Sequence, residues 1–223
     1  MLPLLRYRLL ILFTLLAMCA AAQTPSADRE MRVALFVDRP TKQVMVMTAR
    51  STCSVWADGV RKGELKANDG LRIEVATKGI TARSLSFTVQ ATRIELVPAG
   101  GHGFRMKPLD RKDGERTYPG VLEVSNVGGR LQLIDRLPLE AYTAGVVSAE
   151  AGKEHHIEYY KLQAVSCRTY ALTNMRKHAP EGFELCDGVH CQVFKGKNWN
   201  DSIQQAVDAT HGLVIVDPDI KLI

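Results

Sequence analysis

Cysteine and histidine residues gather in one short stretch of the chain, Cys186-Asp187-Gly188-Val189-His190-Cys191. Thiolate and imidazole are ligands that zinc favours, with four of them in structural sites and three plus a water in catalytic ones. His178 lies eight residues before Cys186 and is the candidate for a fourth ligand. The stretch therefore indicates a structural zinc site formed by Cys186, His190, Cys191 and His178.

Two other interpretations of this stretch stay open, a disulfide between Cys186 and Cys191 or a set of free thiols. The choice depends on the compartment, and the N-terminus indicates export. Arg6 and Arg8 precede an apolar run at 9–19, which ends in Ala20-Ala21-Ala22. A positive start, a short apolar core and a small-residue cleavage site are typical of a secretory signal peptide, here residues 1–22.

Export predicts a location in the periplasm or cell envelope, where disulfides can form. A lipoprotein anchor at Cys19 is the alternative, although the preceding Met18 is larger than such cleavage sites favour. After the leader, no stretch approaches the roughly 20 apolar residues that a membrane helix needs. We therefore expect no transmembrane span after signal cleavage.

The composition excludes several classes of protein. Hydrophobic residues make up 46% of the 223 residues and charged residues 24%, values typical of a folded domain rather than a disordered chain. The net charge of +5 falls to +3 once Arg6 and Arg8 leave with the leader. No concentrated basic surface results, so no nucleic-acid partner is predicted.

The elements that must position these residues follow two patterns. Residues 28–101 alternate between apolar and polar positions, with turn signals between the runs, and predict a small all-β unit. A charged segment at 107–117 is expected to be a mobile connector. The predicted strands of this half are 31–37, 43–48, 71–76, 85–91 and 93–97.

Residues 118–223 are expected to form a mixed α/β domain of the catalytic type. A hairpin at 121–134 turns at Asn126-Val127-Gly128-Gly129, and a short helix follows Pro138. A long helix at 156–177 buries one face, and a third helix starts at Asn200 or Asp201. A further strand is expected at 213–217. The predicted fold class is therefore α+β, with one long buried helix in the second domain.

Five motifs in the second half occur in a specific order. They are YPGVLEV (118–124), LPLEAYTAGVVSAE (137–150), KLQAVSCRTYAL (161–172), CDGVHCQVF (186–194) and AVDATHGLV (206–214). This series resembles the stage II sporulation protein D family of bacterial cell-wall proteins, also called the amidase-enhancer family. The likeness covers about residues 118–223. Family members usually continue beyond the position of Ile223, so the domain is expected to be incomplete at its C-terminus.

The resemblance implies an activity and a catalytic residue. Active members of the family are lytic transglycosylases that cut peptidoglycan glycan strands with one Glu as general acid and base. That Glu corresponds to Glu150, although Ser148, Ala151 and His155-His156 depart from the usual flanking residues. Ordinary glycoside hydrolysis needs two carboxylates, whereas closing a 1,6-anhydro ring needs one, because the 6-hydroxyl of the sugar attacks. We expect Glu150 at a helix end in a partly dry groove.

Other residues of the motifs have less specific interpretations. Arg168 is a candidate to hold Glu150 or contact the glycan, and a structural ion pair is the alternative. Gln192 is a candidate to bind a sugar, or to stabilise a turn. Some family members bind zinc through a similar Cys/His cluster, so the resemblance also implies zinc at Cys186, His190 and Cys191, with His178 as a further candidate.

Three functions from different classes remain. The first is an exported lytic transglycosylase acting on peptidoglycan glycan strands. The second is a non-catalytic wall-binding module that stimulates an N-acetylmuramoyl-L-alanine amidase, as the second family name suggests. An exported zinc or redox protein would be a third.

Overall fold

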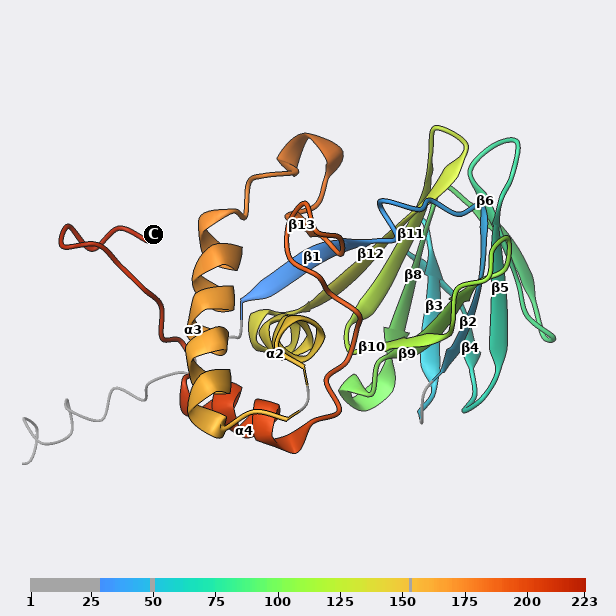
Figure 1. Ribbon diagram of the computed structural model, residues 1–223. Coiled ribbons are helices and arrows are strands. Elements are labelled where there is room, and N and C mark those ends of the chain that lie inside the picture. The colour runs from blue at the N-terminus through green and yellow to red at the C-terminus, as the bar shows by residue number, and fades with distance from the viewer. Residues whose placement is uncertain (1–28, 49–50, 153) are drawn as a thin grey trace, which may run out of the picture.

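The structure is a computed structural model and describes residues 29–48, 51–152 and 154–223. The predicted signal peptide and Cys19 lie outside the described residues. Strands gather at one end of the molecule and three helices at the other (Figure 1). The predicted α+β class is confirmed. None of the helices within the described ranges is long and apolar enough to cross a membrane.

The strands β1 to β13 of the described residues form two sheets. The seven-stranded sheet has the order β13-β1-β12-β11-β8-β3-β4, and the six-stranded sheet has the order β10-β9-β2-β5-β6-β7. The first comprises β13 (Leu185–Cys186), β1 (Glu30–Leu35), β12 (Arg130–Pro138), β11 (Val121–Val127), β8 (Arg93–Pro98), β3 (Cys53–Ala57) and β4 (Val60–Leu65). The second comprises β10 (Arg116–Tyr118), β9 (Phe104–Pro108), β2 (Gln43–Thr48), β5 (Gly70–Val75), β6 (Ile80–Arg83) and β7 (Thr88–Ala91).

One hydrophobic core joins the inner faces of the two sheets. The same cluster of buried residues contains Val46 and Ile73 of the second sheet and Leu96 and Leu122 of the first. Strand β1 lies between β12, to which it is antiparallel, and β13, to which it is parallel. The seven-stranded sheet therefore combines strands from both halves of the sequence.

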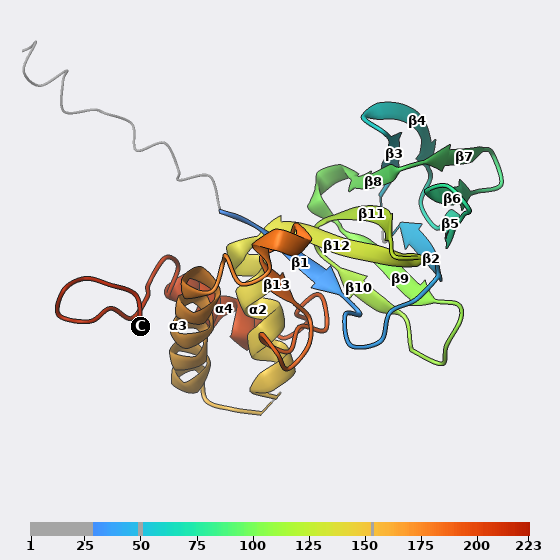
Figure 2. The ribbon, with the colours of Figure 1, turned by 90° about the horizontal axis from the view of Figure 1, so that it is seen from above.

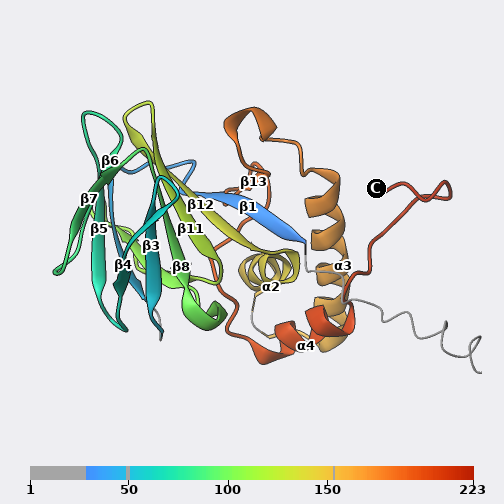
Figure 3. The same ribbon diagram turned by 180° about the vertical axis from the view of Figure 1, so that it is seen from behind.

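The helices cover one end of this sheet. They are α2 (Leu139–Glu150), α3 (Ile157–Thr173) and α4 (Asp201–Ala209), with short 3-10 turns η1 (Ala99–Gly101) and η2 (Ala179–Glu181). Seen from above, α2 lies between the strands and α3 (Figure 2). Seen from behind, α4 crosses below both other helices, and it contacts both (Figure 3).

The long helix buries the face that its sequence predicts. Tyr160, Ala164, Cys167 and Ala171 of α3 are all buried, at the expected steps of three and four residues. The helix stops at Thr173 rather than at residue 177. Helix α2 starts after Pro138, as predicted, and continues to Glu150, so the candidate catalytic residue is the last residue of a helix.

Several local predictions were wrong. The segment predicted as a mobile connector at 107–117 includes the end of β9 and the start of β10, which pair with each other. No strand forms at 213–217 in the described chain, where a single bridge joins Val216 and Leu222. Strands β3, β4, β6 and β9 were missed. Strand β4 is mostly exposed and charged, and the other three are only four or five residues long, so their alternation is a weak signal.

Candidate functional site

Glu150 lies at the C-terminal end of α2 with its side chain exposed. The backbone N–H of Val193 donates a hydrogen bond of 2.8 Å to Oε1 of Glu150. This exposure differs from the partly dry groove that the sequence led us to expect. One carboxylate oxygen is held in place by the protein, and no hydrogen bond within the described chain is recorded for Oε2.

A small buried cluster lies beneath Glu150 and ties three segments together. The hydroxyl of Tyr142 in α2 donates to Oε1 of Gln192 at 3.3 Å. Burial raises the pKa of the Cys167 thiol in α3 to about 12, with a smaller contribution from the charge of Glu150. A hydrogen bond with Gln192 acts on that thiol in the opposite direction. Gln192 is only 7% exposed and makes its contacts inside the protein.

Arg168 is 1% exposed and pairs with a different carboxylate from the one considered in the sequence. Its Nε and Nη2 donate to the two oxygens of Glu140 at 2.8 and 2.5 Å. Its Nη1 donates to the carbonyl of Leu213 at 2.9 Å. Arg168 therefore connects α2, α3 and the segment after α4, which is the structural ion pair that was the alternative interpretation.

The predicted zinc ligands converge. The ligand atoms of His178, Cys186, His190 and Cys191 all lie within 4.8 Å of one another. The Sγ of Cys191 is 3.4 Å from Nε2 of His178 and 3.8 Å from Nδ1 of His190. Metal–sulfur bonds of about 2.3 Å and metal–nitrogen bonds of about 2.0 Å in a tetrahedron require similar separations of about 3.3–3.8 Å.

Neighbouring groups orient the candidate ligands. Nδ1 of His178 is 3.4 Å from a carboxylate oxygen of Glu181, which leaves Nε2 facing Cys191. A carboxylate on the far nitrogen is the usual support of a metal-bound histidine. Cys186 is placed by the pairing of β13 with β1, opposite Ala34. Two thiols and two imidazoles with this support fit a structural zinc ion.

The described cysteines are all free thiols, so the disulfide between Cys186 and Cys191 does not form in this structure. Burial raises the pKa of the Cys186 thiol to about 11. A buried thiol with that pKa keeps its proton at neutral pH, whereas a bound zinc ion would stabilise the thiolate.

The Cys/His cluster and Glu150 are connected by the chain itself. Cys191 belongs to the cluster, Gln192 points into the protein beneath α2, and the N–H of Val193 reaches Glu150. Phe194 is fully buried and its ring lies 5.3 Å from that of Tyr142. Three successive residues therefore link the Cys/His cluster to the candidate catalytic carboxylate.

Sequence reasoning missed three contributors to this region. Glu140 is the partner of Arg168, but the two lie 28 residues apart, so no local pattern pairs them. Glu181 is the partner of His178 and lies only three residues after it, a spacing that could have revealed the pair. Val193 contributes only its backbone N–H, which no side-chain pattern can reveal.

Comparisons with known proteins agree with the order of the motifs. Residues 127–216 match the family model described as stage II sporulation protein. An uncharacterized protein of Brachyspira hyodysenteriae is 34% identical over 97 residues, which are 42% of this chain and 26% of that relative. The chain therefore spans about a quarter of the length of that relative.

These matches show that residues 127–216 resemble the domain of the stage II sporulation protein family. The family is one of cell-wall-related sporulation proteins. The matched region begins at the β11–β12 turn and contains all three helices and the whole Cys/His cluster.

Proposed function

We propose that the protein is exported and cleaves peptidoglycan glycan strands as a lytic transglycosylase, with Glu150 as its general acid and base. The observation that carries this proposal is the position of Glu150. Its carboxylate lies exposed at a helix end, and one oxygen is oriented by the N–H of Val193. The carboxylate is therefore both positioned and accessible to a long polymeric substrate.

The lytic transglycosylase reaction needs only one carboxyl group. Protonated Glu150 donates its proton to the glycosidic oxygen as the bond from that oxygen to C1 of the sugar breaks. The 6-hydroxyl of the same sugar then forms a bond to C1 and closes the 1,6-anhydro ring. Its proton passes to the Glu150 carboxylate, which restores the starting state. No water is consumed, so a second carboxylate to activate water is not required.

The test replaces Glu150 by Gln, which keeps the side-chain shape and removes the proton transfer. We expect release of 1,6-anhydro fragments from purified walls to fall by at least about 100-fold. Glu154→Gln is the matched control, an exposed residue four positions away, and its activity should stay within about twofold of the wild type. Undiminished product release by Glu150→Gln would refute the assignment.

A second function is favoured by the lack of a partly dry groove around Glu150, because a catalytic carboxylic acid usually lies in a partly buried site and this one is exposed. In this alternative the protein binds the wall and stimulates an amidase without cutting the glycan. Glycan binding and amidase stimulation would then survive Glu150→Gln. Digestion of intact and peptide-free walls, with mass analysis of the glycan ends, separates the two functions.

We further propose that His178, Cys186, His190 and Cys191 hold one zinc ion with a structural role. The geometry of the four ligand atoms and the support of His178 by Glu181 favour this assignment. Zinc would keep Cys191 in place and, through the two following residues, the N–H that orients Glu150.

Metal analysis of the purified chain tests the site. We expect one zinc per chain, and a chelator or Cys186→Ser should lower both thermal stability and activity. Cys53→Ser is the control, because Cys53 is buried in β3 away from the cluster. Absence of bound zinc in protein purified with its thiols reduced would contradict the proposal.

A further inference from the structure

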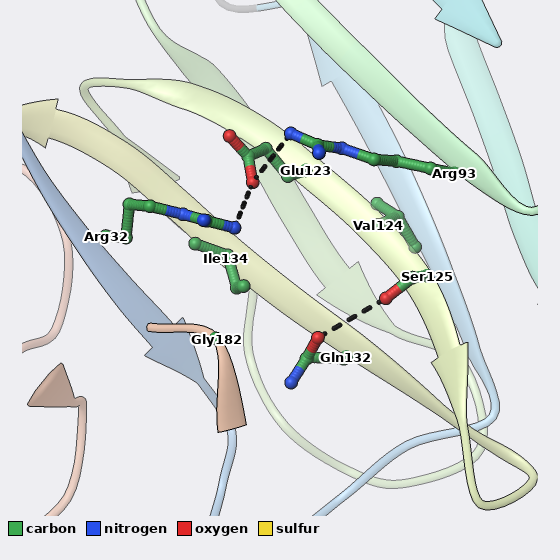
Figure 4. A pocket seen from close by; sticks show the side chains of 8 residues that line it. All are labelled: Arg32, Arg93, Glu123, Val124, Ser125, Gln132, Ile134 and Gly182. Carbon is green, nitrogen blue, oxygen red and sulfur yellow. Dashed lines mark hydrogen bonds and ion pairs between the residues drawn. The ribbon is translucent and has the colours of Figure 1, made fainter. Parts of the chain in front are cut away.

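A separate depression lies on the outer face of the seven-stranded sheet (Figure 4). Its cavity volume is about 200 Å³, which is smaller than the about 300–1,000 Å³ of sites for drug-sized molecules and limits any ligand to a small one. Strand register explains why its lining residues meet. Glu123 is opposite Ile134, and Ser125 is opposite both Gln132 and Arg93. Residues opposite one another on neighbouring strands point to the same face of the sheet.

One end of the depression is charged. Glu123 is only 5% exposed and forms ion pairs with three arginine side chains. Arg32 and Arg93 reach its Oε2 at 2.7 and 3.1 Å, and Arg136 reaches its Oε1 at 3.1 Å. Arg32 and Arg93 line the depression from its two sides, whereas Arg136 does not line it.

The hydrogen-bond balance at this end leaves donors in excess. Both Glu123 oxygens are taken by the arginines. Nε of Arg32 is buried and has no hydrogen-bond partner among the described residues. Glu95 and Glu30 pair with Arg93 and Arg136 at the margins of the network, and Glu184 accepts from the backbone N–H of Arg32. Because Arg32 and Arg93 line the depression, a ligand at this end would meet those of their N–H groups that the carboxylates leave free, and it must supply acceptors for them.

The rest of the depression is neutral. Ile134 is 4% exposed and forms an apolar floor between the two ends. At the far end the hydroxyl of Ser125 donates to the side-chain carbonyl of Gln132 at 3.4 Å. The Gln132 amide also donates to the carbonyl of Glu181 at 3.0 Å, which fixes the loop of Gly182 over this end.

We propose that this depression binds a small carboxylate ligand of the dipeptide type. The carboxylate would accept from Arg32 and Arg93, small aliphatic side chains would lie on Ile134, and the peptide group would face Ser125 and Gln132. A bare phosphate would leave the apolar floor and the neutral end unused. The inference does not depend on the activity proposed for Glu150, which does not line the depression.

Titration of the whole protein with dialanine, followed by NMR or calorimetry, tests the site. We expect saturable binding at ~10 mM probe or below. Dialanine amide, which lacks the carboxylate, should bind at least about tenfold more weakly. The D,D and L,L isomers are compared, since D-alanyl peptides come from bacterial walls and L-alanyl peptides from proteins. Preference for either isomer supports the site and identifies the source.

Substitutions of the arginines test whether dialanine binds in this depression. Arg32→Gln and Arg93→Gln should each weaken dialanine binding at least about tenfold. Arg136→Gln is the matched control, because it removes an equal charge and a bond to the same Glu123 without touching the depression. Its affinity should stay within about threefold of the wild type.

Three outcomes would overturn the proposal. These are no binding of either isomer to the wild type, equal binding of the amide, and an equal loss in Arg136→Gln. The amide comparison uses the unaltered protein, so it decides the matter even where an arginine variant fails to fold.

Discussion

At the scale of single residues, the most consequential interaction is the buried pair of Arg168 and Glu140. The Arg168 side chain is 1% exposed and the Glu140 side chain 11%. Two charges taken out of water are tolerated because each satisfies the other, with the Leu213 carbonyl taking a further donor. Arg168 therefore stabilises the fold by joining α2, α3 and the segment after α4.

Arg168→Met should therefore be strongly destabilising. The substitution leaves the Glu140 carboxylate buried without a partner, and we expect a loss of about 3–5 kcal/mol in the free energy of unfolding. Urea unfolding followed by circular dichroism measures it. Arg61→Gln is the control, since Arg61 forms an exposed ion pair with Glu64 and should lose at most about 1 kcal/mol. Equal, small losses in both variants would show that the buried pair is not important.

Asp135 is a second buried carboxyl group. Neither of its oxygens has a hydrogen-bond partner of good geometry in the described chain. Burial raises the pKa of Asp135 well above its ordinary value, and the backbone of Gly120 offsets only part of that rise. The folded protein consequently holds a proton there that the unfolded chain releases at about pH 4.

This difference predicts a stability that falls as the pH rises. The contribution of Asp135 is fully present below about pH 4, the unfolded pKa, and is lost as the pH rises toward the folded pKa. Relative to Asp135→Asn, the wild type should lose up to about 1.4 kcal/mol per pH unit within this window. Denaturant unfolding at several pH values tests it, with the exposed Asp219→Asn as control. A difference that does not change with pH would contradict the prediction.

At the scale of elements, the contact between α2 and the segment after the Cys/His cluster positions the candidate site. Gly145 lies where the ring of Phe194 and the carbonyl of Gly196 approach the helix. A Cβ at position 145 would lie 2.4 Å from the Phe194 ring and 2.5 Å from that carbonyl oxygen. Only glycine allows this approach, and the same segment provides the N–H that holds Glu150.

Gly145→Ala should push the segment away from α2. We expect a loss of about 1–3 kcal/mol in stability from overpacking, together with reduced activity or wall binding. Gly114→Ala is the matched control, because nothing lies within 4 Å of its added Cβ. Thermal unfolding and wall digestion of the two variants provide the comparison. Full activity in Gly145→Ala would mean that the segment does not position Glu150.

At the scale of the whole molecule, β1 joins the two halves of the sequence. It lies between β12 and β13, and its residues Met31 and Val33 are fully buried. The same strand therefore completes the sheet beneath the helices and fixes Cys186 of the candidate zinc site.

A fragment of residues 118–223 should consequently fail to fold by itself. Without β1, an edge of β12 and the apolar surface beneath it are left open, and β13 has no strand to pair with. We expect no cooperative thermal transition and no zinc retention, whereas residues 29–223 should show both. A fragment with a sharp transition and native-like near-ultraviolet circular dichroism would show that β1 is dispensable.

The sequence by itself determined the local features. The buried face of α3, the start of α2 at Pro138 and the hairpin turn at 126–129 follow from side-chain periodicity and turn chemistry within a few residues. The resemblance to the stage II sporulation protein family also came from the sequence, and the family model matches residues 127–216. The four candidate zinc ligands lie within 14 positions of one another, and their ligand atoms lie close together in the structure.

The tertiary structure alone decided the partners. Glu140 and Arg168 are 28 residues apart, Glu150 and Val193 are 43 apart, and Arg32 and Glu123 are 91 apart. Such pairs form because the packing of helices and the register of strands bring distant segments together, and no local pattern encodes that choice among the many acidic and basic residues. The placement of β1 between β12 and β13 is of the same kind, because strand pairing is decided by burial across the whole sheet.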